Sequence, residues 1–371
     1  MNLSYWEIKT WLTNVDFTIV GSGIVGLNCA LQLKRRFPKS KILILEKGIL
    51  PQGASTKNAG FACFGSLSEI IDDLKSHAED EVLELVQNRM NGLQLLRETI
   101  GDKRMDYQQL GGYELFLNDD TALYETCLAQ QEPMNKLLKP IFKADVFSLK
   151  ENSFKFKNIK ANYSFNQFEG QIDTGKMMEA LLHKVQSLGV KILNNTAVQE
   201  FSEDANTIKV RTNTFEFSTT KLLIATNGFA SQLLNEDVKP ARAQVLITKP
   251  IDNLHIKGTF HLDEGYYYFR NIDNRILLGG GRNLDFKTEE TTQLAQTEII
   301  QNKLEELLKT TILQTTKFQI DQRWSGIMGV GKQKKPIVKP LSNKVFCGVR
   351  LGGMGVAIGS TIGKDLANLV A

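Results

Sequence analysis

The chain has 371 residues, of which 42% are apolar and 23% charged, which is typical of a globular protein too long for one small domain. Its 45 basic and 41 acidic residues leave a net charge of +4, which argues against a dedicated nucleic-acid-binding protein. Four cysteines and four histidines lack paired spacing, so the sequence indicates neither a disulfide framework nor a metal site. Residues 1–17 lack the apolar stretch of an export signal, and no apolar run reaches the ~20 residues that cross a bilayer. We therefore expect a cytoplasmic protein without a membrane span.

The first informative stretch is an apolar segment, residues 16–20, followed by a cluster of glycines. The β-branched residues predict a buried strand, and the pattern of residues 27–37 predicts a helix directly after the glycines. The turn between them consists of Gly21, Ser22, Gly23, Ile24, Val25 and Gly26. Gly21 permits the tight turn, Gly23 lets the backbone approach a pyrophosphate, and Gly26 lets the helix pack closely on its strand. The N-terminus of this helix is therefore expected to face an anion.

A second buried strand is predicted for residues 41–46, and its last residue is Glu46, twenty positions after Gly26. A carboxylate at this spacing can accept hydrogen bonds from both hydroxyls of a ribose. The order of strand, glycine turn, helix, strand and acid predicts a dinucleotide site, with a generic αβ turn and a surface glutamate as the alternative. The negative charge disfavours the 2′-phosphate of NADP, but it does not separate NAD from FAD.

The loop after Glu46, residues 47–66, favours FAD over NAD. It is long and rich in small residues and backbone donors, whereas an NAD-binding domain usually continues directly to its next helix. Such a segment suits a second face of the pyrophosphate, a ribitol chain and a flavin ring. The residues expected to bind the cofactor here are Lys47, Ala54, Ser55, Thr56, Asn58, Ala59 and Gly60.

The rest of the chain alternates between helices and strands. Residues 67–100 have an amphipathic helical pattern, and residues 173–188 predict a second helix that stops at Gly189. Strands at 112–117, 241–248, 266–271 and 276–279 are expected to form a second sheet, while those at 191–193 and 221–225 extend the first. At the C-terminus, a strand at 344–349, a glycine turn at 351–355 and a helix at 356–370 complete the chain.

Four separated blocks of this sequence resemble the FAD-dependent family that includes D-amino-acid oxidase, glycine oxidase and monomeric sarcosine oxidase. They are residues 16–27 with 44–48, residues 53–60, residues 222–234, and residues 323–329 with 345–370. The resemblance implies an α/β fold with a Rossmann-like FAD-binding domain and a second, mostly antiparallel sheet domain for substrate. The expected FAD-binding segments are 1–66, 166–238 and 325–371, and the substrate segments are 67–165 and 239–324.

The resemblance also adds cofactor residues from the later blocks. Val198 is expected to meet the adenine edge, and the strand-to-glycine turn at Thr226, Asn227 and Gly228 is expected to pass the pyrophosphate. The helix N-terminus near the C-terminal glycine turn would stabilise negative charge on the flavin pyrimidine through Gly352, Gly353, Met354, Gly355 and Val356. Neither Cys63 nor a histidine matches an attachment point of the family, so we expect non-covalent FAD.

The predicted strand at 266–271 carries the candidate substrate residues. Alternation places Tyr266, Tyr268 and Arg270 on one face and Tyr267 and Phe269 on the other. By resemblance, Tyr268 lies near the tyrosine that contacts substrate in D-amino-acid oxidase. The alternative is an aromatic sheet face that packs on helices.

Two departures from the family bear on the substrate. Amino-acid oxidases of this group usually place an arginine after the tryptophan–glycine block to hold the substrate carboxylate, and here that position is Met328. Arg350, Arg270 or Arg242 could substitute, and Arg350 is the first choice, although it could instead stabilise flavin or pair with an acid. The lysine-rich residues 332–335 form either a solvated loop or an attraction for a polyanion such as a tRNA.

The function implied by the resemblance is FAD-dependent oxidation of a C–N bond in a small amine or amino acid. Hydride transfer to flavin N5 would give an imine that water hydrolyses, and oxygen or a quinone would reoxidise the flavin. The alternatives are a FAD-dependent 2-hydroxy acid dehydrogenase and a protein similar to tRNA-modifying oxidases, including a flavin-binding module without turnover.

Overall fold

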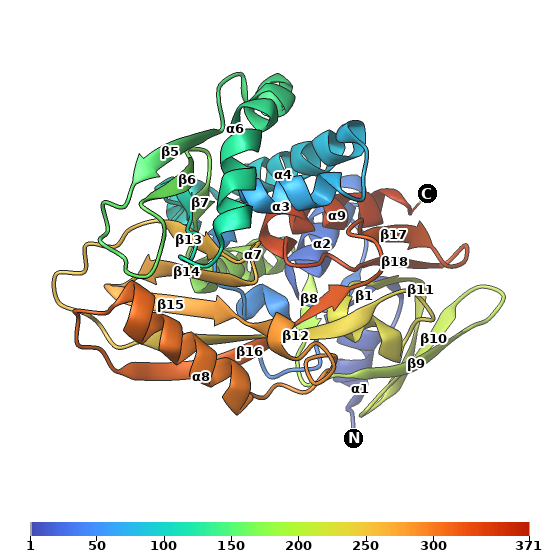
Figure 1. The fold of residues 1–371 in the computed structure, drawn as a ribbon. Coiled ribbons are helices and arrows are strands. Elements are labelled where there is room, and N and C mark those ends of the chain that lie inside the picture. The colour runs from blue at the N-terminus through green and yellow to red at the C-terminus, as the bar shows by residue number, and fades with distance from the viewer. Residues whose placement is uncertain (1, 371) are drawn as a thin grey trace.

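The computed structural model describes residues 2–370, which fold around two large sheets lying next to each other (Figure 1). The central strands of the first sheet are parallel, in the order β18 (Val345–Val349), β11 (Glu216–Ile224), β1 (Val15–Val20), β2 (Ile42–Leu45) and β8 (Lys191–Leu193). Three antiparallel strands are added: β17 (Ile337–Pro340) pairs with β18, β10 (Ile208–Thr212) pairs with the first half of β11, and β9 (Val198–Glu203) pairs with β10. Every residue of β2 is buried, as its uninterrupted apolar sequence requires in a sheet covered on both faces.

Helices cover one face of the first sheet, where Ile19, Ile44 and Leu223 lie in a single apolar cluster with them. These helices are α2 (Ile24–Arg36), α7 (Thr174–Ser187) and α9 (Gly355–Asn368), with α4 (Glu79–Ile100) packed on α9. The other face packs against the β9–β10 hairpin, η3 (Asn227–Gln232) and η1 (Ile8–Leu12), which follows the exposed turn α1 (Tyr5–Glu7).

The second sheet is antiparallel apart from the β13–β4 pair. Its order is β16 (Ile320–Val330), β12 (Lys239–Thr248), β15 (Arg275–Gly280), β14 (Tyr267–Ile272), β13 (Thr259–Leu262), β4 (Gly112–Glu114), β6 (Asn162–Asn166) and β5 (Phe147–Glu151). One face buries Tyr267, Phe269 and Phe260 against α8 (Glu298–Leu307) and η5 (Leu308–Ile312). The opposite face of β14 is thereby turned toward the first sheet.

The remaining elements lie in the connections between these strands and helices. They are η2 (Ala54–Thr56), the small sheet of β3 (Phe61–Ala62) and β7 (Gly170–Gln171), η4 (Arg282–Leu284), and the helices α3 (Leu67–Leu74), α5 (Asp102–Met105) and α6 (Thr121–Phe142).

The predicted fold class is confirmed, and two details differ from expectation. Residues 67–100 form two helices instead of one, because the N–H groups of Ser76 and His77 turn back to the Asp73 carbonyl and Glu81 caps the N–H of Ala78. In addition, β16 pairs with β12 along its whole length, so residues 325–330, expected in the first domain, belong to the second sheet.

Candidate functional site

A cavity of about 490 Å³ lies where the two sheets meet, at the C-terminal ends of β1, β2, β11 and β18. This is the edge at which open α/β sheets bind ligands. Most of the predicted cofactor residues line it, namely Gly21, Gly23, Ile24, Val25, Glu46, Lys47, Ala54, Ser55, Asn58, Ala59, Val198, Thr226, Asn227, Gly352, Gly353, Met354, Gly355 and Val356. The other five, Ser22, Gly26, Thr56, Gly60 and Gly228, are chain neighbours of lining residues.

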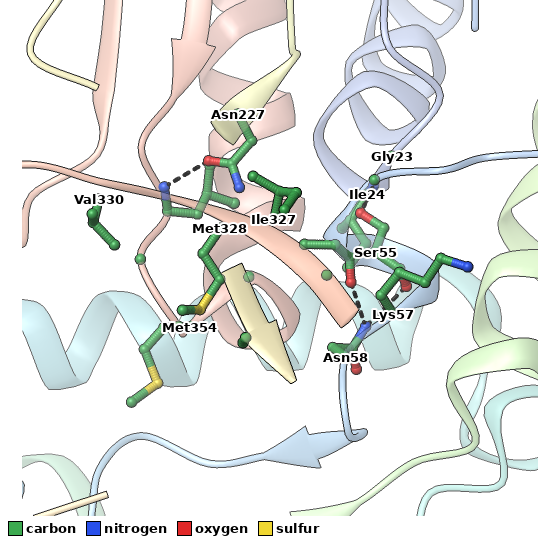
Figure 2. Close-up of a pocket in the computed structure, with 18 of the residues that line it drawn as sticks. Gly23, Ile24, Ser55, Lys57, Asn58, Asn227, Ile327, Met328, Val330 and Met354 are labelled. Carbon is green, nitrogen blue, oxygen red and sulfur yellow. Dashed lines mark hydrogen bonds between the residues drawn. The ribbon is translucent and has the colours of Figure 1, made fainter. Parts of the chain in front are cut away.

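The glycine turn before α2 has the geometry that the sequence predicts. Gly21 has φ +105°, and a Cβ on Gly26 would lie 2.0 Å from the Gly21 carbonyl oxygen, so both positions require glycine. The N-terminus of α2 opens on the cavity, where the Ile24 N–H donates to Ser55 Oγ at 2.9 Å. Figure 2 shows Gly23, Ile24 and Ser55 together on one side of the cavity. Further amides of this helix end remain available to an anion.

Glu46 holds this turn in place from the end of β2. One carboxylate oxygen accepts from the Ser22 N–H at 3.1 Å and the Ser22 hydroxyl at 2.6 Å, and the other accepts from the Gly48 N–H at 3.0 Å. Next to it, the Lys47 ammonium lies over the Phe229 ring, 3.1 Å from its centroid. The acid therefore shapes the glycine turn and also presents an oxygen-rich edge to the cavity.

The opposite side of the cavity is built from the second glycine turn. Asn227 Oδ1 accepts from the Leu351 N–H at 3.1 Å, which fixes the chain between β18 and α9 (Figure 2). Within residues 2–370, the first turn of α9 has no side-chain cap, and the buried Thr226 Oγ1 has no hydrogen-bond partner. Two helix ends and an unsatisfied hydroxyl around one cavity fit a cofactor with an anionic linker and a polar ring, as FAD has.

Tyr268 and Tyr266 both reach this cavity, and the predicted alternation of the strand holds from Tyr267 to Arg270. The ring of Tyr268 lies edge-on to Phe61, with centroids 5.6 Å apart, and crosses Gly279, where a Cβ would lie 2.6 Å from it. Burial raises the pKa of Tyr268 to about 12, so its hydroxyl stays protonated. Met328 lies on the wall beside Met354 and makes that wall apolar (Figure 2).

The three arginines proposed as substitutes for the family arginine lie outside the lining of this cavity. Arg350 donates to Asp237 at 3.0 Å and to the Lys335 carbonyl at 2.9 Å, which matches the acid-pairing alternative instead of substrate binding. Arg242 makes a bidentate pair with Glu289.

Arg270 lines a second cavity of about 350 Å³ and reaches only the Gly60 carbonyl, at 3.3 Å. Arg270 therefore stabilises the end of the loop at residues 53–60 through this hydrogen bond. Burial lowers the pKa of Arg270 to about 10, against the opposing effect of Asp173 and Asp273.

Two of the charged lining residues that the sequence interpretation missed bear most directly on the substrate. His261, on β13, donates from Nε2 to Glu169 at 2.6 Å, and its Nδ1 lies 4.0 Å from Glu69. Burial alone would lower the pKa of His261, but Glu169 and Glu69 outweigh it and raise the pKa to about 9. Because Glu169 is 92 positions away, no local motif reveals this pair. Arg282 is the other, and the three glycines before it were a usable signal.

Lysines of the loop at residues 332–335 form ion pairs with acidic residues of α3 and α4. Lys334 lines the cavity and pairs with Asp73 and Asp72, and Lys335 lies 3.6 Å from Glu84. These pairings offset the positive charge that was considered as an attraction for a polyanion.

The four cysteines are buried free thiols. Within residues 2–370, no group of three or more His, Cys, Asp and Glu residues is arranged to hold a metal, and no helix is long and apolar enough to span a membrane.

Comparisons with known proteins extend over almost the whole chain. A family model described as "DAO: FAD dependent oxidoreductase" matches residues 16–369. The probable oxidoreductase OrdL of Haemophilus influenzae is 20% identical over 377 aligned residues, covering 97% of this chain and 84% of that protein. Glycine oxidase from Geobacillus kaustophilus has a similar structure, with a TM-score of 0.77, 18% identity, and coverage of 96% of this chain and 94% of that one. Iminodiacetate oxidase from Chelativorans sp. BNC1 gives a TM-score of 0.76, 17% identity and 95% coverage of both chains.

Proposed function

Because this chain belongs to the family of FAD-dependent oxidoreductases, we propose that it oxidises the C–N bond of a small amine or amino acid with non-covalently bound FAD. The observation that carries the proposal is one continuous cavity. It joins the α2 N-terminus and Glu46 at one end to the half-buried Tyr268 at the other, so that a long cofactor and a small substrate can share it. The 2-hydroxy acid dehydrogenase activity is the alternative outcome of the same experiment.

FAD, when bound, supplies the chemistry by accepting two electrons and a proton from the substrate carbon, leaving an imine that water converts to a carbonyl compound and an amine. The chain has to bind and orient the substrate. Tyr268 can donate a hydrogen bond from its protonated hydroxyl, and Met328, Ile327 and Phe61 form apolar walls that exclude water. His261, held as a cation by Glu169, cannot accept a proton at neutral pH, so it acts as a fixed charge instead of a base.

The proposal of non-covalent attachment is supported by the state of the two nucleophiles that line the cavity. Burial, with Glu169 and Glu69, raises the pKa of Cys63 well above its usual value, so this thiol is a poor nucleophile. Both ring nitrogens of His261 face carboxylates. Precipitation of the holoprotein with acid is therefore expected to release all of the flavin, leaving a polypeptide of unmodified mass.

The proposed reaction is tested by anaerobic reduction of the purified holoprotein. We expect primary amines, N-methyl amino acids or amino acids to bleach the flavin, with 2-hydroxy acids inactive, and oxygen or a quinone to restore the colour. Bleaching by 2-hydroxy acids alone would establish the alternative dehydrogenase. A colourless protein that cannot be reconstituted with FAD would overturn both. Turnover is expected in the cytoplasmic fraction of the producing cell.

A further inference from the structure

We propose that Arg282 binds the anionic group of the substrate, and that the substrate is therefore an amine carrying a carboxylate. The inference rests on the proposed function and adds the substrate class to it. It assigns the anion-binding role to η4, the turn after β15, at a different place from Met328 on β16, where the resembling amino-acid oxidases carry their arginine.

The end of β15 is built to deliver this side chain to the cavity. Gly280 has φ +120° and Gly281 has φ +79°, and a Cβ on Gly280 would lie 2.0 Å from the Tyr266 carbonyl oxygen. The Gly281 N–H donates a hydrogen bond to the same Tyr266 carbonyl at 2.9 Å, which holds the two segments at this short distance. The chain therefore turns sharply beside Tyr266, and Arg282 enters the cavity next to the tyrosines of β14.

Arg282, which lines the cavity, has no protein group that neutralises its charge within residues 2–370. Its side chain is half-buried, yet in that part of the chain no carboxylate or carbonyl oxygen lies within hydrogen-bonding or ion-pairing distance of its guanidinium. By contrast, two other cations of the lining are paired, His261 with Glu169 and Lys334 with Asp73. A half-buried cation without a partner is costly, and a bound anion would compensate for that cost.

The surroundings of the guanidinium suit a carboxylate. Its carbon lies over the Phe286 ring, 4.7 Å from the centroid, and this cation–π contact uses none of its N–H groups. A free guanidinium edge can bind a carboxylate through two parallel hydrogen bonds. Burial lowers the pKa of Arg282, opposed by Tyr266 and Glu289, and a bound carboxylate would reverse that effect.

The charges around the cavity select a substrate with one negative group. Glu69 and Glu264 line the same end and disfavour a polyanion such as a phosphate ester or a nucleic acid. Met328 and Ile327 leave the adjoining wall apolar. An amino acid, with one carboxylate for Arg282 and an amine that carboxylates can attract, meets both conditions.

The test compares R282M and R282K with the wild-type holoprotein, using matched pairs of an α-amino acid and the amine that lacks its carboxylate. R282M is expected to raise KM for the acid at least about 30-fold, since a bidentate charged hydrogen bond is lost, and to leave KM for the amine within about twofold. R282K should recover part of the loss. The control is R275M, because Arg275 begins β15, the strand that leads to η4, but pairs with Asp321 outside this cavity.

A second readout does not depend on turnover. Acetate and benzoate, titrated into the holoprotein by calorimetry, are expected to bind the wild type and R275M and to lose affinity about 30-fold in R282M, with the FAD content unchanged. Unchanged carboxylate affinity in R282M, or oxidation by the wild type of amines only, would overturn the assignment. Absence of FAD from all of these proteins would instead overturn the proposed function, while the calorimetry still decides the carboxylate site.

Discussion

The two halves of the cavity are built on different principles. The cofactor half uses backbone groups and glycines that lie close together in the sequence, such as the turn from Gly21 to Gly26. The substrate half uses side chains on β13, β14 and β15 whose partners come from distant segments, such as His261 with Glu169. The first kind of site is specified by local steric requirements, and the second by tertiary packing. Substitutions in the cofactor half should therefore reduce stability and flavin binding, whereas substitutions in the substrate half should mainly change substrate affinity.

The largest effect is expected in the cofactor half, from G26A. The added Cβ would lie 2.0 Å from the Gly21 carbonyl oxygen, and backbone on both sides prevents relief. We expect a loss of at least about 3 kcal/mol of unfolding free energy, together with loss of bound flavin. Thermal melting and flavin content measure both. The matched control for stability is G53A in the neighbouring loop, where a Cβ meets no protein atom within 4 Å and φ is −73°, so the free energy of unfolding should stay unchanged.

The substrate half can be tested by moving its charge. R282M combined with M328R would transfer the guanidinium from η4 to β16, on the same cavity. We expect the double variant to bind an α-amino acid at least tenfold more tightly than R282M alone, since a charged hydrogen bond is regained. M328R alone supplies the control, because Arg282 is then still present and the added guanidinium should increase the affinity for the carboxylate less than it does in the R282M background. Equal affinity of R282M and the double variant would show that the position of the charge matters.

A pH-dependent effect on stability is expected from His261. The pKa of His261 is about 9 in the folded chain, above its ordinary value of 6.5. The stabilisation of the folded chain by protonated His261 is therefore fully present below about pH 6.5 and is lost as the pH rises through about 9. The free energy of unfolding should fall by up to about 3 kcal/mol over that interval. H261Q should flatten the slope, whereas H183Q, at an exposed position of α7, should retain it. An identical slope in H261Q would contradict the buried ion pair with Glu169.

A smaller effect is expected from Y268F, which removes one hydroxyl from the substrate end. Burial raises the pKa of Tyr268 to about 12, so it acts as a neutral hydrogen-bond donor across the working pH range. Loss of one such bond should lower kcat/KM about tenfold, with no new pH dependence below pH 10. FAD content should not change. A shifted pH profile would instead assign Tyr268 to proton transfer.

The sequence was sufficient for the cofactor half because each requirement is local. Strand, glycine turn, helix and acid follow one another between residues 16 and 46, and the structure places them as expected. The sequence was insufficient to identify the arginine proposed to bind substrate. An arginine can bind a substrate carboxylate only if its guanidinium faces the cavity and has no acidic partner in the protein, and both depend on tertiary packing. Arg350 follows a promising motif, yet Asp237 occupies its guanidinium, while Arg282 follows three glycines and remains free of protein partners within residues 2–370.

The most direct test of the whole account is a crystal structure of the holoprotein soaked with benzoate. We predict FAD along the cavity, with its pyrophosphate at the N-terminus of α2, its pyrimidine at the N-terminus of α9, and the benzoate carboxylate on Arg282 beside Tyr268. A flavin outside this cavity, or a carboxylate held by Arg350 or Lys334 with Arg282 unoccupied, would contradict it.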